Sequence, residues 1–323
     1  MTAKRFDGHV HLVGNGQGGS GCWLRLDGVW HRMLGEVMRR TIGLEAKVTA
    51  KDFDDKFVAH LAGLVAGSSL DAALLLAQDE VYDDEGRKLA FGSFYVPNEY
   101  LFKVCAAHPR FAPAVSIHPG RKDALEELDR CLAAGARALK LLPNCQNVNC
   151  SLPQYDEFWR RMASAGLPFL CHTGGEMTVP VINRAYQDPR ILRRPLELGV
   201  KVIAAHSSGN SHFFDQNYFG ELIKLMDEFP QMYADTSALN SPIRSGVLKQ
   251  VKESGRLGRF LHGSDYPVPV GAFWVRLRGL ISTAQWREAG RIPNLIERDA
   301  FLKRAMGFDE AHFSRLGEIL RPV

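Results

Sequence analysis

Two histidines end the first apolar stretch of the chain, in the sequence FDGHVH at residues 6–11. Successive side chains of a β-strand point to opposite faces, so His9 and His11 share one side and Val10 takes the other. Two imidazoles directed at one point provide half of a metal site. The pattern is short and common, and two unrelated surface histidines near a terminus would also produce it. Partners elsewhere in the chain therefore decide the interpretation.

Candidate partners stand at the carboxyl ends of later apolar stretches. Lys140 lies within one such stretch, and His172 and His206 end the next two. Asp265 follows the last one. The spacings correspond to one, one and two strand–helix units of about 30 residues each. In a barrel of parallel strands these ends meet on one face, where imidazoles and a carboxylate would suit Zn²⁺, with Mn²⁺, Fe²⁺ or Co²⁺ as alternatives.

The elements that must position these residues alternate between strands and helices. The run DAALLLA at residues 71–77, for example, is typical of a parallel strand that is buried on both faces. We predict strands at 6–11, 71–77, 111–117, 136–142, 167–171, 200–205, 231–235 and 259–261, and helices at 29–41, 52–68, 97–108, 122–134, 153–165, within 179–198, 215–229, 272–284 and 297–306. This order predicts an α/β protein, a (β/α)8 TIM barrel that forms one domain over residues 1–323.

Two insertions interrupt the regular alternation. The glycine-rich stretch GNGQGGSG at residues 14–21 follows the first strand, and we expect it to form a lid or a pocket wall rather than a disordered linker. It has neither the GxGxxG nor the Walker spacing of a phosphate-binding loop. Residues 80–95 contain short apolar stretches around a turn sequence and predict a hairpin.

The composition is that of an ordinary globular protein. Of 323 residues, 46% are hydrophobic and 24% are charged, and the formal net charge is +4. There is no long Lys/Arg run, so we expect no nucleic-acid partner. An apolar stretch of about 18 residues and a leading signal core are both missing, so we expect a cytoplasmic protein without a membrane span. The six cysteines lack a CxxC pair and are expected to be reduced thiols.

Several motifs in order resemble those of a known superfamily. They are HVH at 9–11, LKLLPN at 139–144, CHTGGE at 171–176, AAHSSG at 204–209, HGSDYP at 262–267 and the closing segment PNLIERDAF at 293–301. Together they resemble the amidohydrolase superfamily of metal-dependent hydrolases. The most similar branch is the one often called amidohydrolase family 2, which includes hydrolases and aminocarboxymuconate-semialdehyde-type decarboxylases. The resemblance spans residues 6 to about 307.

The resemblance implies roles for the strand-end residues. His9 and His11 would bind a metal together with His172. His206 would bind a second metal, or hydrogen-bond the substrate or the attacking water. Asp265 would touch the metal and move protons.

Lys140 is open to more than one role. In several members of the superfamily the corresponding lysine is carboxylated by CO₂ and bridges two metals, which requires a neutral amine such as burial favours. As an unmodified cation it would instead hold a substrate carboxylate or form a structural ion pair.

Other residues are candidates for contact with a small-molecule substrate. They are Arg25 in the insertion, Asn144 after Lys140, Glu176 close after His172, and Ser207 after His206. Glu176 could instead orient His172. His118, which follows the third predicted strand, is expected to border the same pocket.

The leading expectation is a hydrolase that cleaves an amide, lactone or other ester bond through metal-activated water. Asp265 would take a proton from the water and pass it to the leaving group, while His206 would help to polarise the carbonyl. One alternative is nonoxidative decarboxylation of a small carboxylic acid at a single metal. Another is a barrel that binds a ligand without turnover. The sequence leaves the substrate and a homo-oligomeric state open.

Overall fold

A parallel sheet organises the molecule. The computed structural model describes residues 3–26, 28–212 and 214–322. Within these residues, eight parallel strands follow one another in the order β1-β3-β7-β8-β9-β10-β11-β12. They are β1 (Phe6–His11), β3 (Ala72–Leu76), β7 (Phe111–Val115), β8 (Ala138–Leu141), β9 (Phe169–Cys171), β10 (Val202–Ala204), β11 (Met232–Asp235) and β12 (Phe260–Leu261). Each predicted strand is confirmed, with bounds that differ by a few residues.

The sheet closes into a barrel between its first strand and the segment after its last one. Val10 forms a parallel bridge with Tyr266, and the backbone N–H of His11 donates to the carbonyl of Tyr266 at 2.8 Å. The N–H of Asp265 donates to the carbonyl of His9 at 2.9 Å. The predicted (β/α)8 TIM barrel is confirmed, and its closing seam joins His9 and His11 directly to Asp265.

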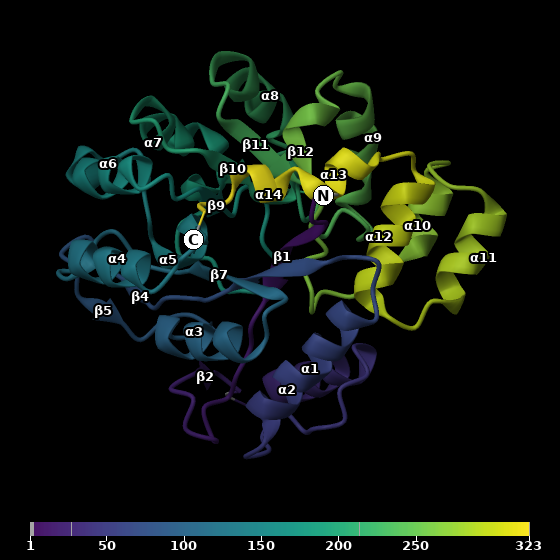
Figure 1. The fold of residues 1–323 in the computed structure, drawn as a ribbon, viewed down its shortest axis with the longest axis horizontal. Coiled ribbons are helices and arrows are strands. Elements are labelled where there is room, and N and C mark those ends of the chain that lie inside the picture. Colours follow the sequence, from purple (N-terminus) through teal and green to yellow (C-terminus); the bar gives the residue numbers. More distant parts are fainter. Residues whose placement is uncertain (1–2, 27, 213, 323) are drawn as a thin grey trace.

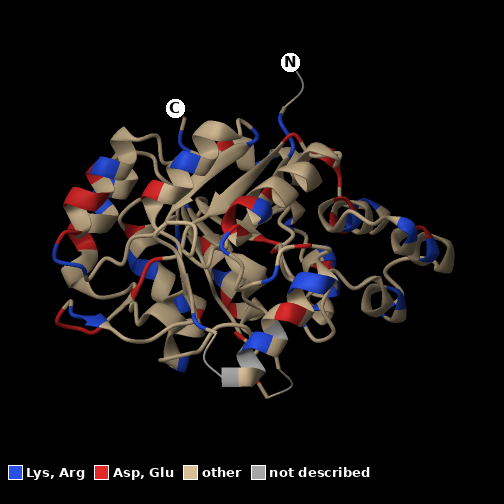
Figure 2. Ribbon diagram, turned by 90° about the horizontal axis from the view of Figure 1, so that it is seen from below, with Lys and Arg blue, Asp and Glu red and all other residues tan. Residues whose placement is uncertain are grey.

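Helices cover the outside of the barrel (Figure 1). They include α2 (Phe53–Ala66), α3 (Asn98–Ala107), α4 (Ala124–Ala133), α6 (Asp156–Ser164), α8 (Phe219–Glu228), α9 (Ser245–Glu253) and α12 (Leu295–Ala305). Helix α6 illustrates why these segments are helical and pack against the barrel. Its first turn is acidic, and Phe158, Trp159 and Met162 form its buried face. The ring of Trp159 stacks on Phe169 of β9 at 5.2 Å. Basic and acidic residues are both spread over these outer helices (Figure 2).

One predicted helix is short, and another is divided in two. The helix expected within 179–198 is confirmed as α7 (Arg193–Glu197), which follows the 3-10 turns Arg184–Gln187 and Pro189–Leu192. Pro189 and Pro195 lack the backbone N–H that a longer helix needs. The helix expected at 272–284 is divided into α10 (Ala272–Leu277) and α11 (Thr283–Arg291), because Gly279 has a φ of +72° and Ser282 begins α11 with a capping box.

Two short C-terminal helices close the amino-terminal end of the barrel, and the sequence did not predict them. They are α13 (Glu310–Ser314) and α14 (Leu316–Ile319). Leu316 and Ile319 join the core inside the barrel, where they pack with strand residues such as Phe6 and Leu74. Alternate strand residues fill this interior, so the barrel is a packed core rather than a pore.

The insertion after β1 forms a wall at the carboxyl-terminal end, but the wall comes from the residues that follow the glycine-rich stretch, since none of residues 14–21 is among the described cavity lining. The glycine-rich stretch is tied to α2, because Asn15 N, Gly16 N and Ser20 Oγ all donate to the Asp54 carboxylate. It leads to β2 (Trp23–Leu24), which pairs antiparallel with β6 (Phe94–Tyr95), and then to α1 (Gly28–Thr41). The predicted hairpin is confirmed as β4 (Val81–Tyr82) and β5 (Lys88–Leu89). No helix in the described part of the chain is long and apolar enough to span a membrane.

Candidate metal centre

Three strand ends bring potential ligands together at the open end of the barrel. His9, His206 and Asp265 each offer an atom, and these atoms lie within 4.8 Å of one another. They come from β1, the turn after β10 and the seam after β12. All three side chains are buried.

His11 and His172 complete the group. The Oδ1 atom of Asp265 lies 3.2 Å from Nε2 of His9 and 3.3 Å from Nε2 of His11. The rings of His172 and His206 lie 4.9 Å apart between centroids. The Nε2 atom of His172 is buried without a hydrogen-bond partner, and its contact with Glu176 Oε2 is 3.4 Å long. The five imidazole and carboxylate side chains predicted from the sequence therefore share one site.

Asp235, at the end of β11, orients two of these histidines. Its Oδ2 accepts a hydrogen bond from Nδ1 of His9 at 2.8 Å, which leaves the lone pair of the His9 ring on Nε2. Its Oδ1 accepts from the backbone N–H of His206 at 2.8 Å. Asp235 was not predicted as a site residue, although it ends the predicted strand 231–235 in the same way that the ligands end theirs. That position was the available signal.

Ser237 fixes the tautomer of His206. Its Oγ donates to Asp235 Oδ1 at 2.5 Å, so its single proton is already used. The Nδ1 atom of His206, 2.9 Å from this Oγ and 3.1 Å from the Ser237 carbonyl, must therefore carry a proton and donate. Nε2 of His206 is then an acceptor that faces the site. Ser237 was also missed, because a serine in a loop carries no distinctive pattern.

The backbone adopts left-handed conformations at His206, at the two residues that follow it and at Asp265. The φ angles are +56° at His206, +50° at Ser207, +55° at Ser208 and +69° at Asp265. Non-glycine residues rarely adopt such angles, and each costs on the order of 1–3 kcal/mol. Strained residues of this kind gather where a structure holds functional groups in place.

Burial sets the protonation states. Burial lowers the pKa of His172 to about 3, against the charge of Glu176, and it holds the pKa of His206 well below its ordinary value. Burial alone would raise the pKa of Asp265, but the adjacent imidazole of His9 and the hydrogen bond with His11 keep it well below the usual range. The site thus presents neutral imidazoles at His172 and His206 and an ionised carboxylate at Asp265.

Lys140 lies at the centre of the group. It is fully buried, and its Nζ is 3.2 Å from Nε2 of His9. Burial lowers its pKa, although the carboxylates of Asp235 and Asp265 act in the opposite direction. An amine with a lowered pKa is what carboxylation by CO₂ requires, and its position also suits contact with a substrate.

The donor set fits a divalent metal ion. Neutral imidazoles and a carboxylate are ligands of Zn²⁺, Mn²⁺, Fe²⁺ and Co²⁺. The unpartnered Nε2 of His172 is a buried polar atom that a metal would satisfy. His9 carries the hydrogen-bonded carboxylate that commonly supports a ligating histidine.

A cavity of about 240 Å³ opens above this group. Of the predicted substrate-contact residues, Arg25 and Glu176 line it, as do Lys140, His11 and His172. Asn144 and Ser207 are absent from its described lining. Ser207 is buried and its hydroxyl donates to the Asp235 carbonyl at 2.7 Å, while the carbonyl of Asn144 accepts from Ile182 N and Asn183 N. Both residues therefore support neighbouring loops.

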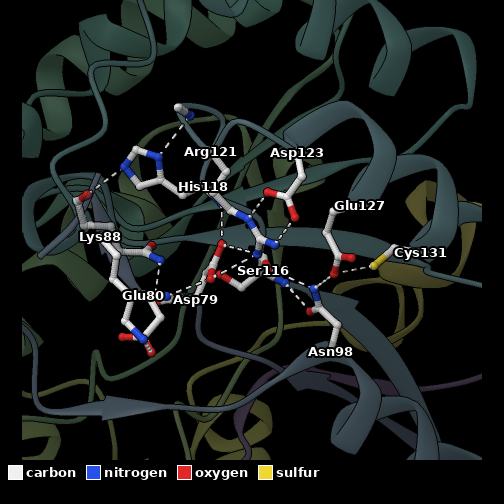
Figure 3. Close-up of polar contacts among 12 residues, drawn as sticks. Asp79, Glu80, Lys88, Asn98, Ser116, His118, Arg121, Asp123, Glu127 and Cys131 are labelled. Atoms are coloured by element: carbon white, nitrogen blue, oxygen red, sulfur yellow. Dashed lines mark hydrogen bonds and ion pairs between the residues drawn. The ribbon is translucent and has the colours of Figure 1, made fainter. Parts of the chain in front are cut away.

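His118 belongs to a separate buried network beside the site rather than to the described cavity lining (Figure 3). Its Nε2 donates to the carbonyl of Gln146 at 2.9 Å, and its Nδ1 accepts from Gly120 N at 3.0 Å. Its backbone N–H donates to Asp79, whose carboxylate also pairs with Arg121 at 3.1 Å. This network joins the loops that follow β3, β7 and β8.

Comparison with known families agrees with this geometry. Residues 6–289 match the family described as Amidohydrolase (Amidohydro_2). The chain belongs to this amidohydrolase family. Its members are metal-dependent hydrolases or decarboxylases, so the chain is an enzyme of a metal-dependent family. A comparison with curated proteins finds no significant match.

Solved structures confirm the fold of this amidohydrolase. An uncharacterised TIM-barrel protein from Bordetella bronchiseptica is 17% identical, with a TM-score of 0.58 over 92% of this chain and 99% of that one. A Pseudomonas putida protein proposed to be a 2-pyrone-4,6-dicarboxylic acid hydrolase is 14% identical, with a TM-score of 0.53 over 96% and 99%. The 5-carboxyvanillate decarboxylase from Sphingomonas paucimobilis is 13% identical, with a TM-score of 0.51 over 97% and 99%.

Proposed function

We propose that this amidohydrolase hydrolyses an amide, lactone or other ester bond of a small molecule, with Zn²⁺ as its preferred metal. The observation that carries the proposal is the position of Asp265. Its ionised carboxylate lies at the base of the cavity, within 3.3 Å of Nε2 of both His9 and His11. An ionised carboxylate beside these histidines is the proton acceptor that activation of water requires.

A metal held by His9, His11, His172 and Asp265, with His206 at the same site, would supply Lewis-acid chemistry by acidifying water and polarising a carbonyl. The protein's own groups do the rest. Asp265 accepts the proton of the attacking water and later delivers it to the leaving group. Its position on the seam, fixed by the hydrogen bond of its N–H to the His9 carbonyl, keeps it beside the reacting atoms.

The protonation of His206 limits what it can do. Because Nδ1 carries the proton, the Nε2 atom that faces the site accepts rather than donates. His206 would therefore serve as a ligand or accept a hydrogen bond from the attacking water. Direct donation to a carbonyl oxygen, as the sequence suggested, does not fit this tautomer.

The experiment that tests the proposal compares the wild-type protein with Asp265→Asn on a panel of lactones, esters and amides. The variant should lose about 100-fold to 10,000-fold in kcat, the range that a general acid–base group contributes. Activity is divided by bound metal, measured by mass spectrometry of the native protein, so that loss of metal is separated from loss of proton transfer. Equal activity at equal metal content would refute the role of Asp265.

Decarboxylation is the second candidate, and Lys140 favours it. An unmodified ammonium in the cavity lining could hold a substrate carboxylate. The structural relatives include both a decarboxylase and a proposed hydrolase, so the shared fold allows either reaction. Two metals per chain and a carboxylated Lys140, seen as a mass increase of the native protein, would support hydrolysis. One metal, unmodified Lys140 and release of CO₂ from aromatic acids would support decarboxylation.

A further inference from the structure

We propose that the substrate carries an uncharged hydrocarbon group, at least as large as a phenyl ring, next to the bond that is broken. This inference rests on the proposed hydrolysis and adds the class of substrate. It follows from the cavity, whose lining includes His172, His206 and Asp265 together with an extended apolar surface. A bound molecule that reaches the candidate ligands therefore also touches that surface.

The apolar surface comes from two parts of the chain that the insertion brings together. One part is the insertion itself, with Leu24, Leu26 and Met38 among the lining residues. The other part is formed by α2 and the loops at the strand ends, with Phe53, Phe57 and Val268. Most of the described lining residues are apolar.

The cationic groups of this wall have partners already. The Nε atom of Arg39 pairs with Glu36 at 2.7 Å, and its guanidinium also donates to the Leu44 and Glu45 carbonyls. The guanidinium of Arg25 lies over the Trp23 ring at 5.5 Å and donates to the Ala90 carbonyl. Both guanidinium groups thus already have partners within the protein. The wall therefore favours an uncharged group of the substrate.

The cavity is large enough for a group of this size. A dry apolar cavity of about 150 Å³ is enough to bind benzene. The present cavity of about 240 Å³ has room for such a ring and for several further atoms that include the reacting carbonyl. A substrate without a hydrocarbon group would leave most of this apolar surface in contact with water, with no gain from burial.

Straight-chain alkyl hydroxamates test the inference by binding, without any need for turnover. Their head group chelates a metal, and their chains extend into the cavity. Between acetohydroxamate and hexanohydroxamate, Kd measured by calorimetry should fall about fourfold per methylene, which corresponds to ~0.8 kcal/mol. The decrease should stop once the cavity is filled. A chain of equal length that ends in a carboxylate should bind at least tenfold more weakly than the alkyl compound.

A matched pair of substitutions on α1 locates the binding site. Met38 lines the cavity, whereas Met33 on the same helix is exposed to solvent. Met38→Trp should weaken binding of hexanohydroxamate at least tenfold and leave acetohydroxamate unchanged. Met33→Trp should bind the whole series as the wild type does. Leu26→Trp, at another lining residue of the insertion, provides a second narrowing variant should the first one fail to fold.

The outcomes separate this inference from the proposed function. A Kd that is independent of chain length, or tighter binding of the carboxylate-terminated chain, overturns the inference even when Asp265-dependent hydrolysis is found. A decrease in Kd with chain length that Met38→Trp abolishes supports it, even if no ester, lactone or amide is cleaved.

Discussion

Asp235 controls the candidate site through hydrogen bonds rather than through contact with a substrate. Its carboxylate accepts hydrogen bonds from Nδ1 of His9 and from the backbone N–H groups of His206 and Ser237. Burial by itself raises the pKa of this carboxyl, but His9 and the hydrogen bonds lower it below its ordinary value. An ionised acceptor at this point keeps Nε2 of His9 free of a proton and directed at the site.

Asp235→Asn should weaken metal binding about 10-fold to 100-fold, the usual effect of removing such a supporting carboxylate. An asparagine amide can turn its NH₂ group toward Nδ1, and the proton of His9 then moves to the nitrogen that must bind the metal. The measurement is a competition between the protein and a chromogenic chelator, which does not depend on activity. Asp129→Asn, in an exposed ion pair with Arg161, is the matched control and should bind metal normally. Unchanged affinity in a folded Asp235→Asn protein would contradict the role.

The loops after β9 and β10 hold each other in position, and Gly174 makes this contact feasible. Its φ is +78°, and a Cβ atom there would lie 2.1 Å from the carbonyl oxygen of Gly209. The adjacent Gly175 N donates to that same oxygen at 3.0 Å. His172 and His206 stand at the starts of these two loops, so their separation depends on the close approach.

Gly174→Ala should destabilise the protein by more than 2 kcal/mol, because a left-handed conformation costs about 1–2 kcal/mol for alanine and the clash with backbone adds to it. Gly166→Ala is the matched control, with a φ of +64° and no atom within 4 Å of the new Cβ. It should cost only the conformational part, about 1–2 kcal/mol. Urea denaturation of both variants gives the two free energies of unfolding. Equal losses would mean that the loops can separate without cost.

The barrel explains how much of the molecule could be predicted from its sequence. Closure of parallel strands forces their carboxyl ends together, so His172, His206 and Asp265 could be brought to one site from their spacing alone. The sequence could not show that Ser207 turns away from the cavity, because this depends on the left-handed backbone after His206. Nor could it show the apolar wall above the site, since that wall requires the insertion to pack against α2.

Acid should destabilise the whole molecule, and His118 provides a measurable part of the effect. Burial lowers its pKa to about 4; the hydrogen bond to Gln146 opposes this change, and the charge of Arg121 adds to it. In the unfolded chain the pKa of a histidine is about 6.5. Between these values the unfolded state binds more protons than the folded one, so stability falls as pH decreases from 6.5 to 4. Below pH 4 both states are protonated and no further loss occurs. At pH 4 the contribution of His118 approaches roughly 3 kcal/mol.

The His118→Gln variant isolates this contribution. A glutamine amide can still donate to the Gln146 carbonyl but does not titrate, so the variant should lose less stability than the wild type between pH 7 and pH 4. The difference should approach the ~3 kcal/mol assigned to His118, read from urea denaturation at each pH.

The variant also loses the acceptor for Gly120 N, which lowers its stability by a constant amount and does not affect how stability changes with pH. Other buried histidines, His262 and His312 among them, titrate equally in both proteins and cancel. Parallel stability curves for the two proteins would contradict this prediction. They would mean that His118, buried between Gln146 and Gly120, becomes charged in the folded state without cost.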